Sequence, residues 1–235
     1  ECRAQRRLMW RNERFLYERA CDLCNKSIIA NYASDSPYTV YCQECWWGDH
    51  WDPRSFGRAV DFKQPFFPQF NDLLQAVPRV NLVASNNENS PYVNYTNYSK
   101  DCHLINGGHT AQRCLYGWRV VDSRDCVDVL QINHSELCYF VSDVTQSYNV
   151  NFSSQVSGSR DCAFVYDCKS SHDCFLSSNL RNASYIFRNK QLTEADYKRT
   201  LAKYDLGSYQ VQQDLWQEYQ TMLIRQTIHR AMQTL

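Results

Sequence analysis

The sequence predicts a mainly β fold: a narrow parallel β-solenoid, an N-terminal zinc ribbon, and helices flanking them at both ends. The first observation is a twelve-residue period across residues 90–190, because a fixed period over many units indicates stacked, equivalent coils. The second is a pair of C-x-x-C motifs at zinc-ligand spacing. The third is the helix-forming composition of residues 1–20 and 191–235. The cysteines on the twelve-residue grid are Cys102, Cys114, Cys126, Cys138, Cys162 and Cys174.

Composition limits the class of protein. Lys plus Arg and Asp plus Glu both total 25, which argues against a uniformly nucleic-acid-coating or a uniformly acidic protein. No apolar run approaches the roughly 18 residues that span a bilayer, so no membrane segment is expected. Of the 12 cysteines, most fall in metal-ligand spacing or on the grid. That placement favours a reducing compartment, and hence a cytoplasmic or virion-associated protein.

Residues 1–20 are predicted to form an arginine-faced helix, because they contain no Gly or Pro. At 100° per residue, four arginines share one face of this helix. Two interpretations stay open. In the first, the face contacts nucleic-acid phosphates or a partner, since guanidinium groups bind phosphate oxygens bidentately. In the second, the face is solvated, and Glu13 and Glu18 partly compensate its positive charge. The four are Arg3, Arg7, Arg11 and Arg14.

Residues 21–60 are predicted to form a zinc ribbon. Each C-x-x-C turn directs two sulfurs inward, and two such turns complete a tetrahedron around one ion. The intervening residues read as a strand, a polar turn at Ser34–Pro37 and a second strand through Val40. Four cysteine ligands close the coordination sphere, so the predicted Zn²⁺ is structural. The ligands are Cys21, Cys24, Cys42 and Cys45.

The same region allows a catalytic interpretation beside the structural one. Asp49-His50 has the residue types of an HNH nuclease, but such an enzyme needs a further Asn or His downstream to hold its metal, and WDPRSFGRAVDF offers none. We expect the nearby tryptophans and His50 to form a hydrophobic cap on a ribbon too small to bury a core alone. Base stacking by this aromatic surface is the alternative.

Residues 61–89 are predicted to form an apolar connector between the ribbon and the first coil. Phe66, Phe67, Phe70, Leu73 and Leu74 are spaced as one short helical face that stops before Pro78.

Four segments up to this point carry a resemblance to a family: Tyr41–Trp47, Trp51–Pro53, Gly57–Phe62 and Pro65–Phe70. With them, the chain resembles an uncharacterised family of metagenomic bacterial and phage-like proteins. In that family an N-terminal zinc ribbon with four cysteine ligands precedes short Cys- and Asn-rich repeats. The resemblance covers most of residues 1–190 and implies architecture alone.

Residues 90–190 align in rows of twelve that begin at Cys102. Columns one and three are two residues apart, so both are predicted to point inward from a strand. Column seven supplies another inward position, and small residues in column ten permit a tight turn. One turn of the solenoid, called a rung, is therefore 12 or 24 residues long. The cysteines are predicted to stack as a ladder inside it. Column one holds the cysteines and Val150; column three holds Leu104, Tyr116, Asp128, Phe140, Phe152, Phe164 and Leu176; column seven holds Gly108, Val120, Ile132, Val144, Val156, Cys168 and Leu180; column ten holds Ala111, Ser123, Ser135, Ser147, Ser159, Ser171 and Ala183.

Three functions of short-period solenoids make different demands on these columns. An ice-binding surface needs an outward array of Thr, and no column supplies one. A β-helix enzyme needs clustered acids and bases, and column twelve does repeat Asp101, Asp125, Asp161 and Asp173. These aspartates lie where the chain turns, and bonding to backbone amides explains them more simply. A rigid spacer or docking platform requires only regularity.

Residues 191–235 are predicted to form a helical C-terminal cap. Thr193-Glu-Ala-Asp196 is typical of a helix start, and that helix should run to about Asp205. An amphipathic pattern from Tyr209 predicts a second helix reaching the terminus. These helices are expected either to cover the open end of the solenoid or to pack on a partner subunit in a homo-oligomer.

Taken together, the sequence predicts a non-enzymatic structural or interaction protein. The zinc ribbon and the basic helix would dock a rigid solenoid platform onto a larger protein or ribonucleoprotein assembly, such as a virion. The alternative is a β-helix enzyme that acts on carbohydrate or nucleic acid through the outer face of the solenoid.

Overall fold

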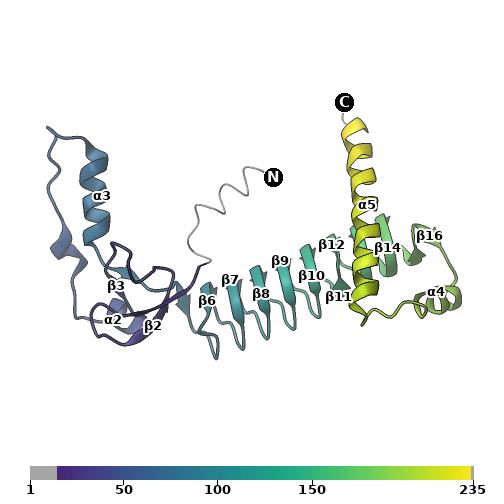
Figure 1. Ribbon diagram of the computed structural model, residues 1–235, viewed down its shortest axis with the longest axis horizontal. Helices are drawn as coiled ribbons and strands as arrows, with labels where there is room; N and C mark the ends of the chain where they lie inside the picture. The colour runs from purple at the N-terminus through teal and green to yellow at the C-terminus, as the bar shows by residue number, and fades with distance from the viewer. Residues whose placement is uncertain (1–14, 234–235) are drawn as a thin grey trace.

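The computed structural model describes residues 15–233, with the side chains of residues 15–225. It confirms the predicted fold class: a parallel β-solenoid of about nine turns, with a cysteine cluster at its N-terminal end and helices beside it. The solenoid forms an elongated body; α5 projects from its C-terminal coils, and α3 projects from the N-terminal module at the other end (Figure 1).

The elements follow one another along the chain as the solenoid is built coil by coil. They are β1 (Tyr17–Ala20), β2 (Ser27–Ala30), β3 (Val40–Tyr41), α2 (Gln43–Trp47), the 3₁₀ helix η2 (Pro53–Phe56), α3 (Phe66–Ala76), β4 (Arg79–Val80), β5 (Ala84–Ser85), β6 (Val93–Asn97), β7 (His103–His109), β8 (Leu115–Val121), β9 (Val127–Asn133), β10 (Tyr139–Thr145), β11 (Tyr148–Asn151), β12 (Ser154–Ser157), β13 (Arg160–Lys169), β14 (His172–Arg181), β15 (Ser184–Phe187), β16 (Lys190–Gln191), α4 (Glu194–Leu201) and α5 (Tyr209–Gln233).

The coil contains twelve residues, which decides between the two predicted rung lengths. Val127 pairs with Tyr139, and Val129 pairs with Val141, in parallel register. The same offset of twelve continues in the neighbouring coils. Each coil therefore stacks on its own equivalent, and the strands β5 to β15 form one parallel sheet that winds around the core.

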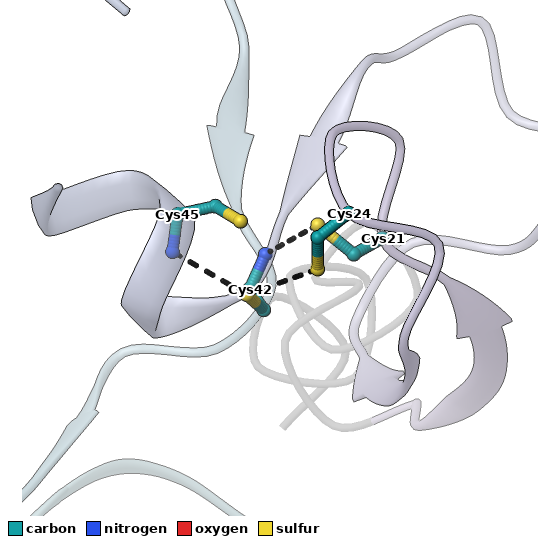
Figure 2. A group of neighbouring side chains, drawn as sticks. All are labelled: Cys21, Cys24, Cys42 and Cys45. Atoms are coloured by element: carbon teal, nitrogen blue, oxygen red, sulfur yellow. Dashed lines mark hydrogen bonds between the residues drawn. The ribbon is translucent and has the colours of Figure 1, made fainter. Parts of the chain in front are cut away.

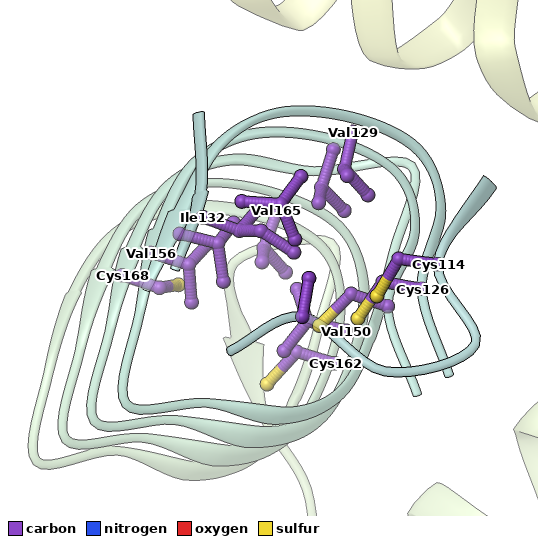
Figure 3. Packing of buried hydrophobic residues seen from close by; sticks show 14 of the residues in the cluster. Cys114, Cys126, Val129, Ile132, Val150, Val156, Cys162, Val165 and Cys168 are labelled. Atoms are coloured by element: carbon purple, nitrogen blue, oxygen red, sulfur yellow. The ribbon is translucent and has the colours of Figure 1, made fainter. Parts of the chain in front are cut away.

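The backbone of each coil has a shorter period of three. From Tyr95 to Arg188, every third residue has a positive φ, between 44° and 56° except at Gly107 and Gly158. The residue after each of these points inward, so columns one, four, seven and ten line the core. Figure 3 shows these inward side chains filling a narrow tube. Four bends per coil let only twelve residues close around an apolar interior.

A left-handed backbone costs a non-glycine residue about 1–2 kcal/mol, and Asn and Asp tolerate it best. The bends accordingly contain many of both types, including Asp101, Asp125, Asn149, Asp161 and Asp173 in column twelve. The prediction that the column-twelve aspartates occupy turns is confirmed, but the hydrogen bonds described for their carboxylates go to neighbouring side chains and not to backbone amides. Where Leu137 or Phe140 stands at a bend, the pairing with the coils above and below must maintain the conformation.

The prediction that column three points inward is wrong. Leu104, Tyr116 and Phe140 are exposed, because each adopts the left-handed conformation and the alternation of a regular strand does not apply. Column four takes the inward place that the sequence predicts for column three. Its members are Ile105, Gly117, Val129, Val141, Ser153, Val165 and Ser177.

Column ten does more than permit a tight turn, because its serines form a hydrogen-bonded ladder. Ser147 Oγ donates to the Thr145 carbonyl at 2.8 Å and accepts the Ser159 N–H at 3.3 Å. The same pattern joins Ser123 to Ser135 and Ser159 to Ser171. Each hydroxyl thus satisfies a buried backbone donor of the next coil, which would cost about 1–3 kcal/mol if it were left unpaired.

The N-terminal module differs from the predicted ribbon in its strand pairing. Strands β2 and β3 do not pair with each other: β2 pairs antiparallel with β1, and β3 pairs in parallel with β4. The predicted helix of residues 1–20 is wrong over Tyr17–Ala20, because these residues form β1 and complete the hairpin that carries the first two cysteines. Residues 1–14 lie outside the described part of the chain.

The module closes the N-terminal end of the solenoid through β3 and β4. Asn81 donates its backbone N–H to the Tyr41 carbonyl at 2.9 Å and its side-chain amide to the Ile29 carbonyl at 2.7 Å. The side-chain amide of Gln43 also donates to the Leu82 carbonyl. The segment that leads into the first coil is therefore fixed to both strands of the module.

The predicted connector helix is confirmed as α3, but its role as an apolar strap is not. None of its residues is buried, and Phe67 is 78% exposed. Phe66 stacks on Phe70 with ring centroids 5.7 Å apart. The apolar face of α3 therefore covers neither the module nor the first coil.

The two C-terminal helices contact different parts of the solenoid. Strand β16 pairs antiparallel with β15 and covers the last edge, and α4 packs beside it through Tyr197 and Tyr185. Thr193 caps α4 as predicted by accepting the Asp196 N–H, although the helix ends at Leu201, before Asp205. Helix α5 instead packs on the lateral face of β13 and β14, where Tyr219 donates to the Val165 carbonyl at 3.1 Å.

Candidate metal centre

The four predicted ligands converge at the N-terminal module. Their sulfur atoms all lie within 4.8 Å of one another, and they form the single group of metal-ligating side chains found in the described part of the chain. Figure 2 shows Cys21 and Cys24 approaching from one loop, and Cys42 and Cys45 from the start of α2. Tetrahedral coordination with metal–sulfur bonds of about 2.3 Å needs sulfurs slightly closer than this limit. The set can therefore bind a metal ion.

Local backbone structure positions each pair of thiols. Asn25, at φ 60°, turns the chain after β1 so that its N–H bonds to the Cys21 carbonyl at 2.9 Å. At the other pair, Cys42 is the N-cap of α2, and its sulfur accepts the Cys45 N–H at 3.4 Å. The Cys42 N–H in turn bonds to the Cys21 sulfur at 3.2 Å, which joins the two pairs.

These hydrogen bonds set the ionisation of the site. Burial acts to raise the pKa of Cys21, but the N–H groups of Cys24, Cys42 and Leu23 outweigh it and lower the pKa to about 7. Burial raises the pKa of both Cys42 and Cys45. The site thus holds one thiol with a lowered pKa beside two with raised pKa values, and a bound cation would favour the thiolate form of each.

Polar contacts around the ligands fix the loop between the two pairs. Arg19 is buried, and it donates to the Asp22 carboxylate at 2.9 Å and to the Ala33 carbonyl at 3.0 Å. Asp22 also accepts the Val40 N–H at 2.6 Å. On the surface, Lys26 pairs with Glu44 at 3.1 Å, so the two ligand-bearing segments are connected there as well.

The predicted aromatic cap is formed in part. Trp51 contacts Trp46 at 4.7 Å and Tyr41 at 5.7 Å, and its indole N–H donates to the Trp46 carbonyl. Trp47 and His50 are exposed and outside this cluster. Within residues 15–225, His50 and Asp49 belong to no group of metal-ligating side chains.

The other predicted site residues fall into two classes. The structure describes none of the four arginines, since Arg3, Arg7, Arg11 and Arg14 lie within residues 1–14. The six cysteines of the ladder are described, and all are buried free thiols. Each sulfur bonds to the carbonyl two residues earlier, as Cys126 does to Arg124 at 3.1 Å. They pack as the predicted interior ladder.

Aspartates on the outer surface of the solenoid bond mostly within the stack. Arg113 forms two hydrogen bonds to Asp125, at 2.6 and 2.7 Å, and Asn149 donates to Asp161 at 2.8 Å. The acidic stripe is therefore engaged in contacts between coils at Asp125 and Asp161, and no group of three or more metal-ligating side chains forms along it within the described coils.

The sequence interpretation missed a lateral groove of about 740 Å³ on the solenoid. Its floor is formed by columns three to five of successive coils, and Trp216, Tyr219 and Leu223 of α5 form one wall. Column three could have revealed it, since that column repeats large apolar residues that prove to face outward. Its exposed members here are Tyr92, Leu104, Tyr116, Asp128 and Phe140.

Comparisons add no relative from which a role could be transferred. No protein-family model matches the chain, and no curated protein matches it. The resemblance to metagenomic bacterial and phage-like proteins stays a prediction. Within residues 15–233, no helix combines the length and the apolar composition of a membrane span.

Proposed function

We propose that this protein is a non-enzymatic docking platform, in which a zinc-stabilised N-terminal module attaches a rigid solenoid to a larger protein or ribonucleoprotein assembly of the cytoplasm or a virion. The observation that carries the proposal is the uncovered apolar face of α3. Phe66, Phe67 and Phe70 are all exposed on one short helix, and Phe62, just before it, is 95% exposed. Contiguous exposed apolar surface usually marks an interaction site.

Zinc is the metal that best fits the cysteine set. Four thiolates provide the soft, tetrahedral donors that Zn²⁺ takes in closed structural sites. The module has little core of its own: the cluster of buried residues around the site consists of Cys21, Cys42 and Cys45. Metal binding would therefore supply the free energy that holds the module and the docking helix in place.

Regular stacking supports the role of a rigid platform. Each coil pairs with its neighbour along its whole length, and side-chain ladders connect successive coils inside and outside. A solenoid of this kind keeps its two ends at a fixed separation. The module would then attach one end, while α5 is presented at a fixed distance from it.

The docking role is tested by the double substitution Phe67→Glu and Phe70→Glu in cells that carry the protein. We expect the native protein to co-sediment with a high-mass assembly and the variant to sediment as the free protein. Tyr209→Glu is the matched control, because it changes an aromatic side chain that is 73% exposed at the opposite end of the molecule. An α3 variant that still co-sediments fully would contradict the proposal.

The predicted phosphate contacts are tested separately with Arg7→Glu and Arg11→Glu. If the assembly is a ribonucleoprotein and these residues contact it, binding should weaken and its salt dependence should decrease by about one phosphate contact for each arginine. Ribonuclease treatment distinguishes RNA from protein as the contacted component. Unchanged binding and salt dependence would remove residues 1–14 from the docking surface.

A further inference from the structure

We propose that the lateral groove binds the distal half of α5 from a second copy of this chain, so that two copies pair through their C-terminal helices. The groove and α5 are neighbours on one side of the solenoid, and α5 extends well beyond the coils (Figure 1). A helix that lines one groove can therefore reach the same groove on a second molecule.

The first argument is continuity with an interface that already exists within the chain. At the C-terminal coils, the proximal part of α5 covers column three: Tyr219 packs on Phe164 with ring centroids 6.2 Å apart, and Trp216 meets Phe140 at 5.0 Å. Tyr219 is buried there. The same column continues into the groove as exposed Leu104 and Tyr116, so α5 covers only part of an apolar surface of the kind that it binds.

The second argument is the length of α5. The helix has 25 residues and is about 37 Å long. Among the described side chains, its contacts with the apolar cluster on the solenoid end at Leu223. Ile224, directly after it, is 64% exposed. The helix continues from there to Gln233 and away from the coils (Figure 1), and its sequence includes Ile228 and Met232.

The third argument is charge complementarity. Asp128 is the one charged residue among the described residues that line the groove. The other aspartates nearby have polar partners: Asp125 bonds to Arg113, for example, and Asp143 to Gln131. Asp128 has no such partner among the described residues, and its neighbours in column three are the aromatic Tyr116 and Phe140.

The distal half of α5 carries the opposite charge. After Glu218 the sequence contains no acidic residue, but it contains Arg225 and Arg230. Arg225 is exposed. Ile224 and Arg225 thus present an exposed apolar side chain and an exposed guanidinium, the charge complement of Asp128, next to each other on the helix. In a twofold dimer each copy would supply both a helix and a groove.

The test is the oligomeric state of the purified full chain, measured by sedimentation equilibrium over a concentration series. We expect a dimer whose dissociation constant rises about a hundredfold or more in Asp128→Arg, since like charges at an interface are strongly unfavourable. Ile224→Glu should weaken the dimer similarly. Asp143→Arg, which changes an acidic residue of the same coils outside the groove, is the matched control and should leave the dimer intact.

A charge exchange keeps the test informative if one variant misfolds. Combining Asp128→Arg with Arg225→Asp and Arg230→Asp should restore association to within about tenfold of the native chain. A native chain that stays monomeric, or groove and helix variants that dimerise as tightly as the native chain, would overturn the proposal. A monomer that dimerises only after removal of residues 1–14 would also overturn it, because the chain's own N-terminal segment would then be the occupant.

This dimer is independent of the proposed docking function. Phe67→Glu with Phe70→Glu should abolish docking and leave the dissociation constant of the dimer unchanged. The failure of one proposal therefore does not imply the failure of the other.

Discussion

The cysteines of the N-terminal module and those of the solenoid are the same residue type used in two different ways. In the module, four thiols from two separated segments converge on one point, and N–H donors lower the pKa of Cys21 to about 7. In the solenoid, the thiols stack one per coil and bond to carbonyl groups. There the neighbouring Cys114 thiol and burial raise the pKa of Cys102. The same residue type thus converges on one point in the module and packs as a small core residue in the solenoid, and the hydrogen-bond partners of the sulfur atoms differ accordingly.

Replacing a cysteine of the module should have the largest effect on metal content and stability, and this effect distinguishes the two uses of cysteine. Cys45→Ser removes a ligand, and we expect the bound metal to fall from about one ion per chain to none. The free energy contributed by the metal, on the order of 10 kcal/mol, is then lost, so residues 15–60 should lose their protection from proteases and from hydrogen exchange. Metal analysis and hydrogen exchange measure both results.

Cys126→Ser is the matched substitution in the ladder. A hydroxyl can donate to the Arg124 carbonyl as the thiol does, so we expect a loss of only about 1–2 kcal/mol in the free energy of unfolding and no loss of metal. Chemical denaturation measures it. Equal metal loss in the two variants would mean that the ladder and the metal site are not independent.

A smaller effect should come from the serine ladder. Ser147→Ala leaves the buried Ser159 N–H without its acceptor, which should cost about 1–3 kcal/mol. Ser123→Ala and Ser135→Ala should cost similar amounts, because the same bonds recur, whereas Ser170→Ala, at an exposed bend, should cost little. Chemical denaturation compares the four variants. If all four substitutions were neutral, column ten would require small residues for their size alone and not for their hydroxyl groups.

The left-handed bends predict a stabilising substitution. Leu137 is exposed at φ 55°, a conformation that Asn adopts at lower cost than Leu. Leu137→Asn should raise the free energy of unfolding by about 0.5–1 kcal/mol, measured by chemical denaturation. Val83→Asn is the control, because Val83 is similarly exposed, lacks a positive φ and lies outside the groove. If the free energy of unfolding rose in both variants, the cause would be the removal of exposed apolar surface and not the left-handed backbone conformation.

The twelve-residue period and the cluster of four cysteines could be predicted from sequence because each is a spacing of one residue type. The orientation of the columns could not. A separation of two residues implies a common face only in a regular strand, and Tyr116 and Phe140 lie at left-handed bends, where that rule fails. Columns one, four, seven and ten have the period of three that lines the core, but column four includes Gly117 and Ser153, which are not typical apolar core residues.

The pairing within the N-terminal module was equally hidden from sequence. A ribbon predicts that the two strands between the cysteine pairs form a hairpin, but Val40–Tyr41 pairs with Arg79–Val80, almost 40 residues later. Strand β3 thus finds its partner in β4, which lies in the segment that leads into the first coil and forms a two-stranded sheet with β3 beside the solenoid sheet. The groove depended on the same long-range information, since α5 is more than 60 residues away from the coil of Tyr139–Thr145 that it borders.

The smallest expected effect concerns the ion pairs between coils. The Arg113 guanidinium lowers the pKa of Asp125 below its ordinary value, so this pair stabilises the fold above the ordinary carboxyl pKa of about 4. That stability is lost as the pH falls through the lowered pKa of the folded state. Asp125→Asn should therefore be less stable than the native chain at neutral pH, with a difference that shrinks in acid. Asp72→Asn, which changes an exposed carboxylate on α3 that has no ion-pair partner in the described chain, is the control. Thermal unfolding from neutral to acidic pH measures both variants, and a pH-independent difference for Asp125→Asn would assign its effect to the bend and not to the ion pair.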